Sequence, residues 1–150
     1  MFEPKNILVP TDFSNYSQHA LRQAVDIARH YQSKISLLHV VDEAVQQCMV
    51  DYCLPEAVMR QLDAQSMKAS ADKLQDEISK LGDTAFGIEI IPVVKRGVPY
   101  DEIVKEQEMR HIDLIVMTSH GKTGILKTML GGVVERVLRE AKCPMLLLRM

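Results

Sequence analysis

The sequence predicts an α/β protein built on a parallel sheet with helices on both faces. Short apolar runs of strand length alternate with longer segments whose apolar residues recur at helical spacing. The apolar runs are continuous, as expected for parallel strands that are buried on both faces. No internal repeat, linker or low-complexity tract divides the chain, so we expect residues 1–150 to form a single domain.

Turn and cap residues separate the expected elements. Ser14 is a residue type that caps helix N-termini, and Gly82 is a type that follows helix C-termini. Residues 42–53 show no clean period and are expected to form a loop. We expect strands at residues 6–10, 34–41, 86–95, 112–117 and 144–148, and helices at 15–31, 55–81, 99–110 and 131–141.

The long helix predicted at 55–81 carries a set of apolar residues at roughly helical spacing. Methionine in such a set can form an adaptable partner surface, but the spacing favours a stripe that faces the core. The residues of this stripe are Val58, Leu62, Met67, Ala71, Leu74 and Ile78.

Composition is that of an ordinary globular protein, with 47% hydrophobic and 25% charged residues. A formal net charge of −2 gives no broad basic field to attract nucleic acid or anionic lipid. The N-terminal residues lack a signal pattern, and no apolar run approaches the ~18 residues of a membrane span. We therefore expect a cytoplasmic protein that binds neither nucleic acid nor membrane.

The cysteines are Cys48, Cys53 and Cys143, which make neither an even set nor a CxxC pair. They fit a reducing compartment. Cys48 and Cys53 lie close together in the sequence, but without a second pair or a nearby histidine we interpret them as free thiols rather than as a redox or metal site.

Polar residues follow three of the expected strands. In an open, doubly wound sheet, ligands bind beyond the carboxyl ends of the strands, where the winding reverses. Pro10, Thr11 and Asp12 follow the first strand, Asp42 follows the second, and residues 118–122 follow the fourth. These residues are expected to gather at one edge of the sheet.

Two catalytic motifs are nearly matched here but fail on spacing. Residues 121–123, Gly-Lys-Thr, resemble the end of a phosphate-binding P-loop, yet that motif needs a glycine at position 116, which is Val116. Ser119 and Gly121 resemble part of a serine-hydrolase elbow, yet Met117 occupies its first glycine position. We therefore expect neither a P-loop NTPase nor a serine hydrolase.

A simpler anion site is physically coherent at the same edge. Backbone amides after the fourth strand and the free amides of the helix that follows can converge on a phosphate. Glycines permit close approach, Lys122 and Lys127 add positive charge, and Asp12 can bond a ribose hydroxyl or help hold a phosphate-bound Mg²⁺. The alternative is that the glycines serve only as turn and cap residues; these are Gly121, Gly124, Gly131 and Gly132.

Along most of its length the chain resembles the universal stress protein family. The similar stretches are ILVPTDFS at the start, LLHVVD after the second strand, Gly97 and Pro99, DLIVMTSHGKTG, and LGGVVERVLREAKCPMLLL near the end. The resemblance implies a Rossmann-like, adenine-nucleotide α-hydrolase-like sheet of five parallel strands in the order 3-2-1-4-5. It also implies a homodimer with a regulatory role in the stress response and, in one branch, bound ATP.

The ATP-binding branch has the pattern G-x2-G-x9-G-[ST], which falls here on Thr118, Gly121, Gly131 and Gly132. Thr118 replaces a glycine and adds a side chain near the phosphates. Gly132 replaces a hydroxyl residue, which removes one hydrogen bond, about 1 kcal/mol or several-fold in affinity. Whether ATP, ADP or AMP is preferred therefore stays open. The resemblance implies further pocket residues: Pro10, Thr11, Asp12, Val40, Met117, His120, Val133 and Val134.

Two other functions remain open on the sequence. One is a nucleotide-free interaction module of the same family, which Thr118 and Gly132 favour. The other is a slow ATP hydrolase, for which only Asp12 is a candidate metal contact. His120 has no visible acid or nucleophile beside it, so we expect it to hydrogen-bond or to pack the loop rather than to act as a base.

The last strand gives an expectation about assembly. In the implied order, residues 143–149 lie at the sheet edge with no charge before Arg149. An apolar edge left bare invites uncontrolled pairing. We therefore expect the same strand of a second copy to cover it in a two-fold homodimer.

Overall fold

A computed structural model of the chain describes residues 1–120 and 132–149, without the side chains of residues 45, 46, 48 and 49. The elements are β1 (Asn6–Pro10), α1 (Asn15–Tyr31), β2 (Lys34–Asp42), α2 (Glu43–Asp51), α3 (Glu56–Ser79), the short 3-10 helix η1 (Gly82–Ala85), β3 (Ile90–Gly97), α4 (Pro99–Met109), β4 (Leu114–Thr118), α5 (Gly132–Glu140) and β5 (Met145–Leu148). The strands form one five-stranded sheet in the order β3-β2-β1-β4-β5. Every neighbouring pair is parallel, which confirms the expected fold class and strand order.

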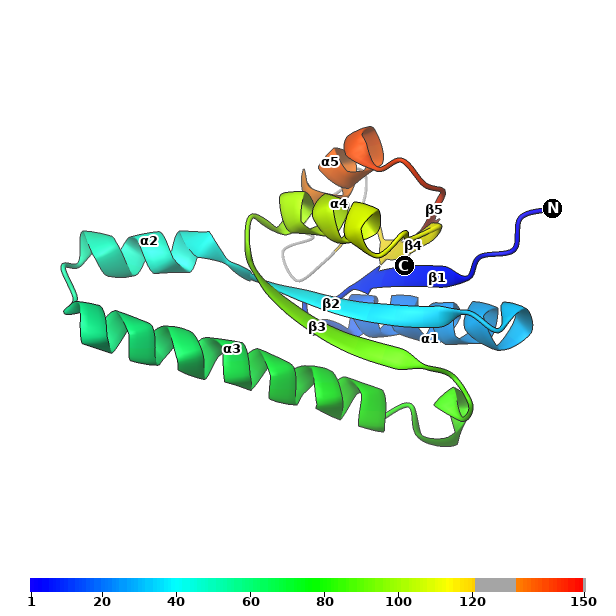
Figure 1. Cartoon of the computed structure of the whole chain (residues 1–150), viewed down its shortest axis with the longest axis horizontal. Coiled ribbons are helices and arrows are strands. Elements are labelled where there is room, and N and C mark those ends of the chain that lie inside the picture. The colour runs from blue at the N-terminus through cyan, green and yellow to red at the C-terminus, as the bar shows by residue number, and fades with distance from the viewer. Residues whose placement is uncertain (121–131, 150) are drawn as a thin grey trace.

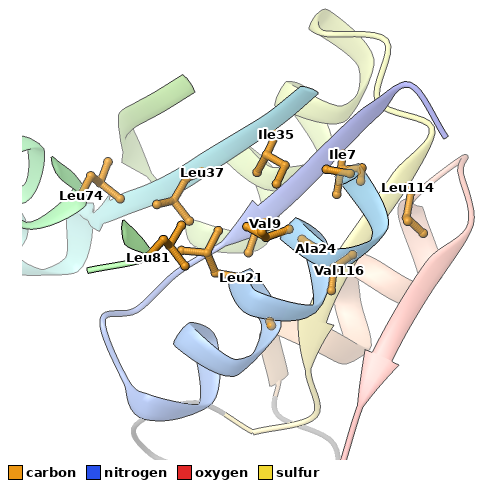
Figure 2. Packing of buried hydrophobic residues seen from close by; sticks show 13 residues of the cluster. Ile7, Val9, Leu21, Ala24, Ile35, Leu37, Leu74, Leu81, Leu114 and Val116 are labelled. Atoms are coloured by element: carbon orange, nitrogen blue, oxygen red, sulfur yellow. The ribbon is translucent and has the colours of Figure 1, made fainter. Parts of the chain in front are cut away.

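Two hydrophobic layers enclose the sheet. On one face, α1 and α3 pack against residues such as Ile7, Val9 and Leu37 (Figure 2). On the other face, α4 and α5 pack against Leu8 and Ile115 of the central strands. Successive residues of β1 thus point into opposite layers, as the period of a strand requires. No helix among the described residues is long and apolar enough to cross a membrane.

The expected bounds of β1 and α1 are confirmed, and Ser14 caps α1 with its side-chain oxygen, which accepts from the backbone N–H of Ser17. Residues 42–53 were expected to be a loop, and this was wrong, because α2 occupies most of the segment. The helix has weak amphipathicity, so the residues show no period that would predict it. The strand expected from residue 86 starts instead at Ile90, after η1.

The core-facing stripe predicted for α3 is confirmed only in part. Leu74 is buried and Leu62, Met67 and Ile78 are half-buried, but Val58 and Ala71 are exposed, and there the prediction was wrong. The buried residues of α3 are Ser70, Leu74 and Glu77, a mostly polar set. In Figure 1, α2 and the first turns of α3 extend beyond the end of the sheet, so that apolar residues in this part of α3 have no sheet to cover.

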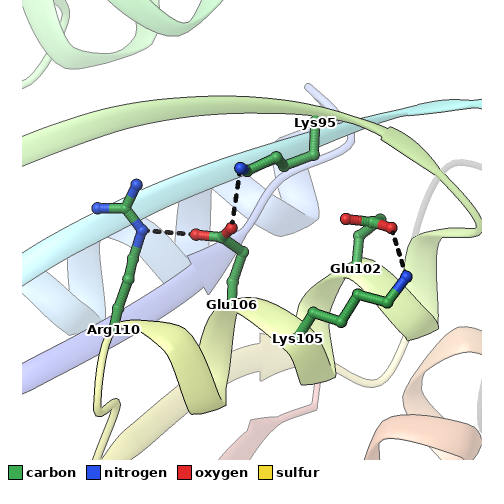
Figure 3. A network of polar contacts seen from close by, with 5 residues as sticks. All are labelled: Lys95, Glu102, Lys105, Glu106 and Arg110. Carbon is green, nitrogen blue, oxygen red and sulfur yellow. Dashed lines mark hydrogen bonds and ion pairs between the residues drawn. The ribbon is translucent and has the colours of Figure 1, made fainter.

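A buried carboxylate fastens α4 to the strand at the sheet edge. Glu106 is almost fully buried and pairs with Lys95 of β3 at 3.3 Å and with Arg110, one helical turn later, at 2.5 Å (Figure 3). The turn before α4 is tight, because a Cβ atom added at Gly97, whose φ is 152°, would lie 2.8 Å from the side chain of Glu102. The ion pair with Lys95 holds α4 against β3, and the helix begins at Pro99 directly after the turn.

Candidate functional site

A cleft opens at the carboxyl ends of the central strands, between the turn after β1 and the first turn of α5. It encloses about 240 Å³, near the lower end of small-molecule sites, which span ~300–1,000 Å³. Its walls combine apolar side chains with one carboxylate and two imidazoles among the described residues. The lining residues are Pro10, Thr11, Asp12, Ser17, Leu38, His39, Val40, Pro99, Ile103, Met117, Thr118, His120, Gly132, Val133 and Val134.

The structure brings together every predicted site residue that it describes. The residues after β1, the end of β2, the end of β4 and the start of α5 all line this one cleft. Gly121 and Gly131 lie outside the described residues, as do Lys122, Gly124 and Lys127. The rule that places ligand sites at strand ends therefore located the cleft from the sequence.

Five lining residues were missed by the sequence analysis. Leu38 and His39 precede Val40 on β2, and Ser17 lies in the first turn of α1. Pro99 and Ile103 come from α4, which follows β3. The same strand-end rule, applied to β3 as well, would have indicated Pro99. Nothing in the sequence indicated that Ile103 of α4 would line the cleft.

The turn after β1 is held by its own hydrogen bonds. The Thr11 backbone N–H donates to the Leu38 carbonyl at 2.8 Å, and the Phe13 N–H donates to Thr11 Oγ1 at 3.1 Å. The Ser14 N–H donates to Asp12 Oδ1 at 3.0 Å, which fixes the carboxylate of Asp12. Phe13 has a φ of 63°, in the left-handed region that a bulky residue rarely adopts. The turn therefore presents Asp12 at the cleft in a defined and strained conformation.

A second carboxylate lies behind this turn. Glu77 of α3 is 5% exposed, and its Oε2 and Oε1 atoms lie 3.1 and 3.3 Å from Thr11 Oγ1, which donates to the carboxylate. Burial, the largest effect, raises the pKa of Glu77 above its ordinary value, and the charge of Asp12 adds to the rise. The hydrogen bonds from Thr11 and Gln18 and the charge of Lys80 oppose it. The sequence analysis placed no functional residue on α3.

His39 supports the same turn from β2. Its Nδ1 lies 2.8 Å from the Thr11 carbonyl oxygen. Because a carbonyl only accepts, Nδ1 carries the proton and donates. The imidazole also lies against the ring of Phe13, with 4.2 Å between the ring centroids. His39 is thus a wall residue of the cleft.

The opposite wall follows β4. The Thr118 hydroxyl donates to the His120 carbonyl at 2.8 Å, so this side chain is turned into its own loop. Ser119 is buried, and its Oγ lies 2.9 Å from Nδ1 of His120. His120 therefore has the hydrogen-bonding role that the sequence predicted.

The near-matches to catalytic motifs fall inside β4. Val116 and Met117 are strand residues paired with Leu146 and Leu147 of β5. A loop that wraps phosphates needs glycine at the first position, and a nucleophile elbow needs it at the second. Both positions carry buried side chains in a regular strand, so neither motif is present.

The N-terminus of α5 completes the cleft. Gly132 is the first residue of the helix, and Val133 and Val134 follow it along the cleft wall. The first N–H groups of a helix have no intrahelical acceptor and carry partial positive charge. Among the described residues, no heavy atom lies within 4 Å of the position that a Cβ atom at Gly132 would take. This end of the cleft suits an anion, and it has space for a small side chain.

The described residues do not build a metal site by themselves. No group of three or more histidine, cysteine, aspartate or glutamate side chains in residues 1–120 and 132–149 is arranged to hold a cation. Asp12 is the acidic residue of the described cleft lining. A divalent cation at this site would need ligand oxygens from a bound molecule.

An open parallel sheet with an apolar cleft at its carboxyl edge, bordered by a helix N-terminus, defines a Rossmann-like class of small-ligand proteins. The sequence profile of the universal stress protein family matches residues 3–149. Universal stress protein MJ0531 of Methanocaldococcus jannaschii is 32% identical over 145 residues, which cover 97% of this chain and 82% of the relative. Universal stress protein MJ0577 of the same archaeon is 31% identical, with 97% of this chain and 94% of the relative covered. The chain belongs to the universal stress protein family.

Solved structures show the same fold. The structure of hypothetical protein MJ0577 superimposes with a TM-score of 0.84 at 29% identity, over 99% of this chain and 98% of that one. A universal stress protein solved in complex with cAMP has a TM-score of 0.65 at 22% identity, over 99% and 98% of the two chains. The universal stress protein of Archaeoglobus fulgidus in complex with dAMP has a TM-score of 0.58 at 16% identity, over 97% and 98%. At these last two identities the likeness concerns the fold.

Proposed function

We propose that the protein binds an adenine nucleotide, with ATP as the leading candidate, in the cleft at the carboxyl edge of its sheet, and that the nucleotide acts as a regulatory ligand. The observation that carries the proposal is the convergence of the β1 turn, the ends of β2 and β4 and the first turn of α5 on one cleft. Proteins of the same fold have been solved with cAMP and with dAMP, which supports this ligand class.

Each part of the cleft suits one part of a nucleotide. The apolar residues Val40, Met117 and Val134 offer flat, dry contact to a base. Asp12, oriented by the Ser14 N–H, accepts a hydrogen bond from a ribose hydroxyl. The N-terminus of α5 offers free backbone N–H groups to the phosphates. Alternatively, Asp12 would help to hold a phosphate-bound Mg²⁺, which would neutralise phosphate charge.

The two departures from the ATP-binding pattern have different consequences. The Thr118 hydroxyl bonds to His120 within its own loop, so its effect on a phosphate is mainly steric. Gly132 lacks a hydroxyl, and no atom of residues 1–120 or 133–149 would obstruct a Cβ there. We expect Gly132→Ser to strengthen ATP binding several-fold, because the added hydroxyl supplies a hydrogen bond of about 1 kcal/mol. Titration calorimetry measures the gain, and Gly132→Ala, which adds only the methyl group, is the matched control.

Titration calorimetry with ATP, ADP and AMP, each with and without Mg²⁺, tests the proposal. We expect saturable heat with at least one of the three nucleotides. An absence of heat at millimolar nucleotide, together with no nucleotide released when freshly purified protein is denatured, would leave the interaction module without nucleotide as the better account.

A regulatory role requires that turnover be slow. Rapid phosphoryl transfer needs a positioned base and a dependable metal site. Among the described lining residues, Asp12 is the candidate metal contact, and His120 is already bonded to Ser119 through Nδ1. We expect phosphate release below a few turnovers per minute. Faster release that is abolished by Asp12→Asn would instead make the protein a hydrolase.

We also propose a homodimer built on residues 143–149. β5 is the last strand of the sheet order and its residues are all half-buried. The same strand of a second copy would bury these side chains and pair the edge amides. Leu147→Lys is expected to yield monomers or aggregates in sedimentation at micromolar concentration, while circular dichroism checks that the fold persists. A wild type that sediments as a monomer, or a variant that sediments as an unaltered dimer, would contradict this interface.

A further inference from the structure

The buried carboxylate of Glu77 is unusual for its position. It belongs to the helix layer opposite α4 and α5, where the surrounding cluster is apolar, and it lies beside Leu74 on the buried side of α3. Burying a carboxylate costs free energy unless hydrogen bonds and opposite charge offset the lost hydration. Its pKa is raised, which indicates that the offset is incomplete. A neutral side chain would fit the layer at lower cost.

The hydrogen of the Thr11 hydroxyl is the link from Glu77 to the cleft. An ionised carboxylate only accepts, so Thr11 Oγ1 must donate its single hydrogen to Glu77. The lone pairs of Thr11 Oγ1 then face the N–H of Phe13 at 3.1 Å and the Ser17 hydroxyl at 3.0 Å. Glu77 therefore determines where the Thr11 hydroxyl hydrogen points and leaves the oxygen free to accept from the Phe13 N–H.

Thr11 Oγ1 is hydrogen-bonded to the residue of the turn that has a strained backbone conformation. Thr11 Oγ1 accepts a hydrogen bond from the backbone N–H of Phe13, and Phe13 is the residue with a φ of 63°. A strained backbone persists only where its surroundings over-determine it. Asp12 lies between Thr11 and Phe13, so the clamp on these neighbours also fixes where its carboxylate points.

We propose that Glu77 is a positioning residue: its ionised carboxylate fixes the Thr11 hydroxyl and, through it, the turn that presents Asp12 to a bound nucleotide. This inference rests on the proposed function of the cleft. It assigns α3 a role in the site although Glu77 does not line the cleft.

Protonation of Glu77 reverses the hydrogen bond between Glu77 and Thr11, while the Phe13 N–H still donates to Thr11 Oγ1. A protonated carboxyl group donates to Thr11 Oγ1, and the Thr11 hydrogen then turns towards Ser17. Asp12 from the β1 turn and Lys80 from the end of α3 are the charged groups that face Glu77, and Lys80 is itself paired with Asp76 at 2.6 Å. α1 contributes the neutral side chain of Gln18. Protonation removes the charge that strengthens the hydrogen bond between Thr11 and Glu77. We therefore expect nucleotide affinity to weaken as pH falls through the raised pKa of Glu77.

The test compares nucleotide binding and folding in Glu77→Gln. Gln keeps the shape and can accept from Thr11, but it lacks the charge that strengthens the bond and its amide can also donate. We expect the Kd for ATP with Mg²⁺ to rise about five- to tenfold at neutral pH, while the melting temperature does not fall. Asp72→Asn is the control, because it removes an exposed carboxylate from the same helix; its Kd should stay within about twofold of the wild type.

Three further measurements distinguish a positioning role of Glu77 from a purely structural one. Thr11→Val and the double variant should bind ATP equally weakly, because Glu77 acts only through the Thr11 hydroxyl. The ratio of the Kd of Glu77→Gln to that of the wild type should approach one at acid pH, and this ratio cancels the titration of the nucleotide phosphates. Glu77→Asp, which keeps the charge but shortens the reach, should weaken binding as well.

The outcomes are distinct. If the wild type binds ATP and Glu77→Gln binds equally or more tightly, or if its losses add to those of Thr11→Val, the positioning role is overturned and the proposed function stands. If the wild type binds none of ATP, ADP and AMP, both proposals are overturned.

Discussion

α1 and α3 cover the same face of the sheet but are built in different ways. α1 buries Ala20, Leu21, Ala24 and other apolar residues, of which Figure 2 labels Leu21 and Ala24. Ser14 caps its first turn. α3 buries one leucine, Leu74, with a serine and Glu77. α1 packs an apolar face on the sheet and contributes only Ser17 to the cleft, whereas α3 lines no part of the cleft but contacts its β1 turn through Glu77 and Thr11.

This difference explains why the apolar pattern of the sequence identifies the buried face of α1 but not that of α3. An apolar stripe at helical spacing states which face of a helix is buried, and α1 follows that rule. In α3, the apolar residues Val58 and Ala71 are exposed, whereas a glutamate is buried. A polar residue is buried where a specific partner is available, and the partner of Glu77 is Thr11, far away in the sequence.

Of the α1 and α3 variants considered, Leu21→Ala in α1 is expected to change the free energy of unfolding most. Leu21 is 2% exposed within the cluster that joins α1 to the sheet. Removing its side-chain methyl groups leaves a cavity, which should lower the free energy of unfolding by about 2–5 kcal/mol. Denaturant titration monitored by circular dichroism gives the value. A loss below about 1 kcal/mol would mean that α1 does not support the sheet as its packing indicates.

Glu77→Gln should have a smaller and opposite effect on stability. Because its folded-state pKa is raised, Glu77 contributes stability that is present below its ordinary pKa and is lost as pH rises through the raised value. The variant lacks this loss, so its stability relative to the wild type should increase from acid to neutral pH. Thermal unfolding across that range measures the difference. A variant that becomes relatively less stable towards neutral pH would show that the ionised carboxylate stabilises the fold.

Val58→Ala on the exposed part of α3 should have the smallest effect, within about 0.5 kcal/mol. Val58 is 39% exposed and lies in the part of α3 beyond the sheet (Figure 1). The same denaturant titration applies, and the Leu21→Ala result serves as the scale. A loss comparable with that of Leu21→Ala would mean that a surface absent from the isolated chain covers this part of α3.

Much of the fold could be predicted because it depends on local patterns. Strand lengths, the cap at Ser14 and the alternation of strands and helices are encoded by neighbouring residues, and β1 and α1 were placed with their observed bounds. α2 was missed because it has no strong apolar face. Its helical conformation is not marked by the periodicity on which the prediction depended.

The site was predictable as far as strand ends determine it. Thr11, Asp12, Val40 and Thr118 lie at the ends of adjacent strands, so topology alone brings them together. Ile103 and Glu77 belong to helices, and their distance from the cleft depends on how α4 and α3 pack. Such packing is set by contacts between distant residues, for example Lys95 with Glu106, that a single sequence does not pair.

The central claim, that a nucleotide occupies this cleft, is tested most directly by filling the cleft. Val133 and Leu138 both lie on α5 with similar exposure, 37% and 43%, but only Val133 belongs to the described cleft lining. We predict that Val133→Trp weakens ATP binding at least tenfold in titration calorimetry, about 1.4 kcal/mol, and that Leu138→Trp leaves the Kd unchanged. Equal affinity in both variants and the wild type would contradict the claim, because the nucleotide would then bind elsewhere.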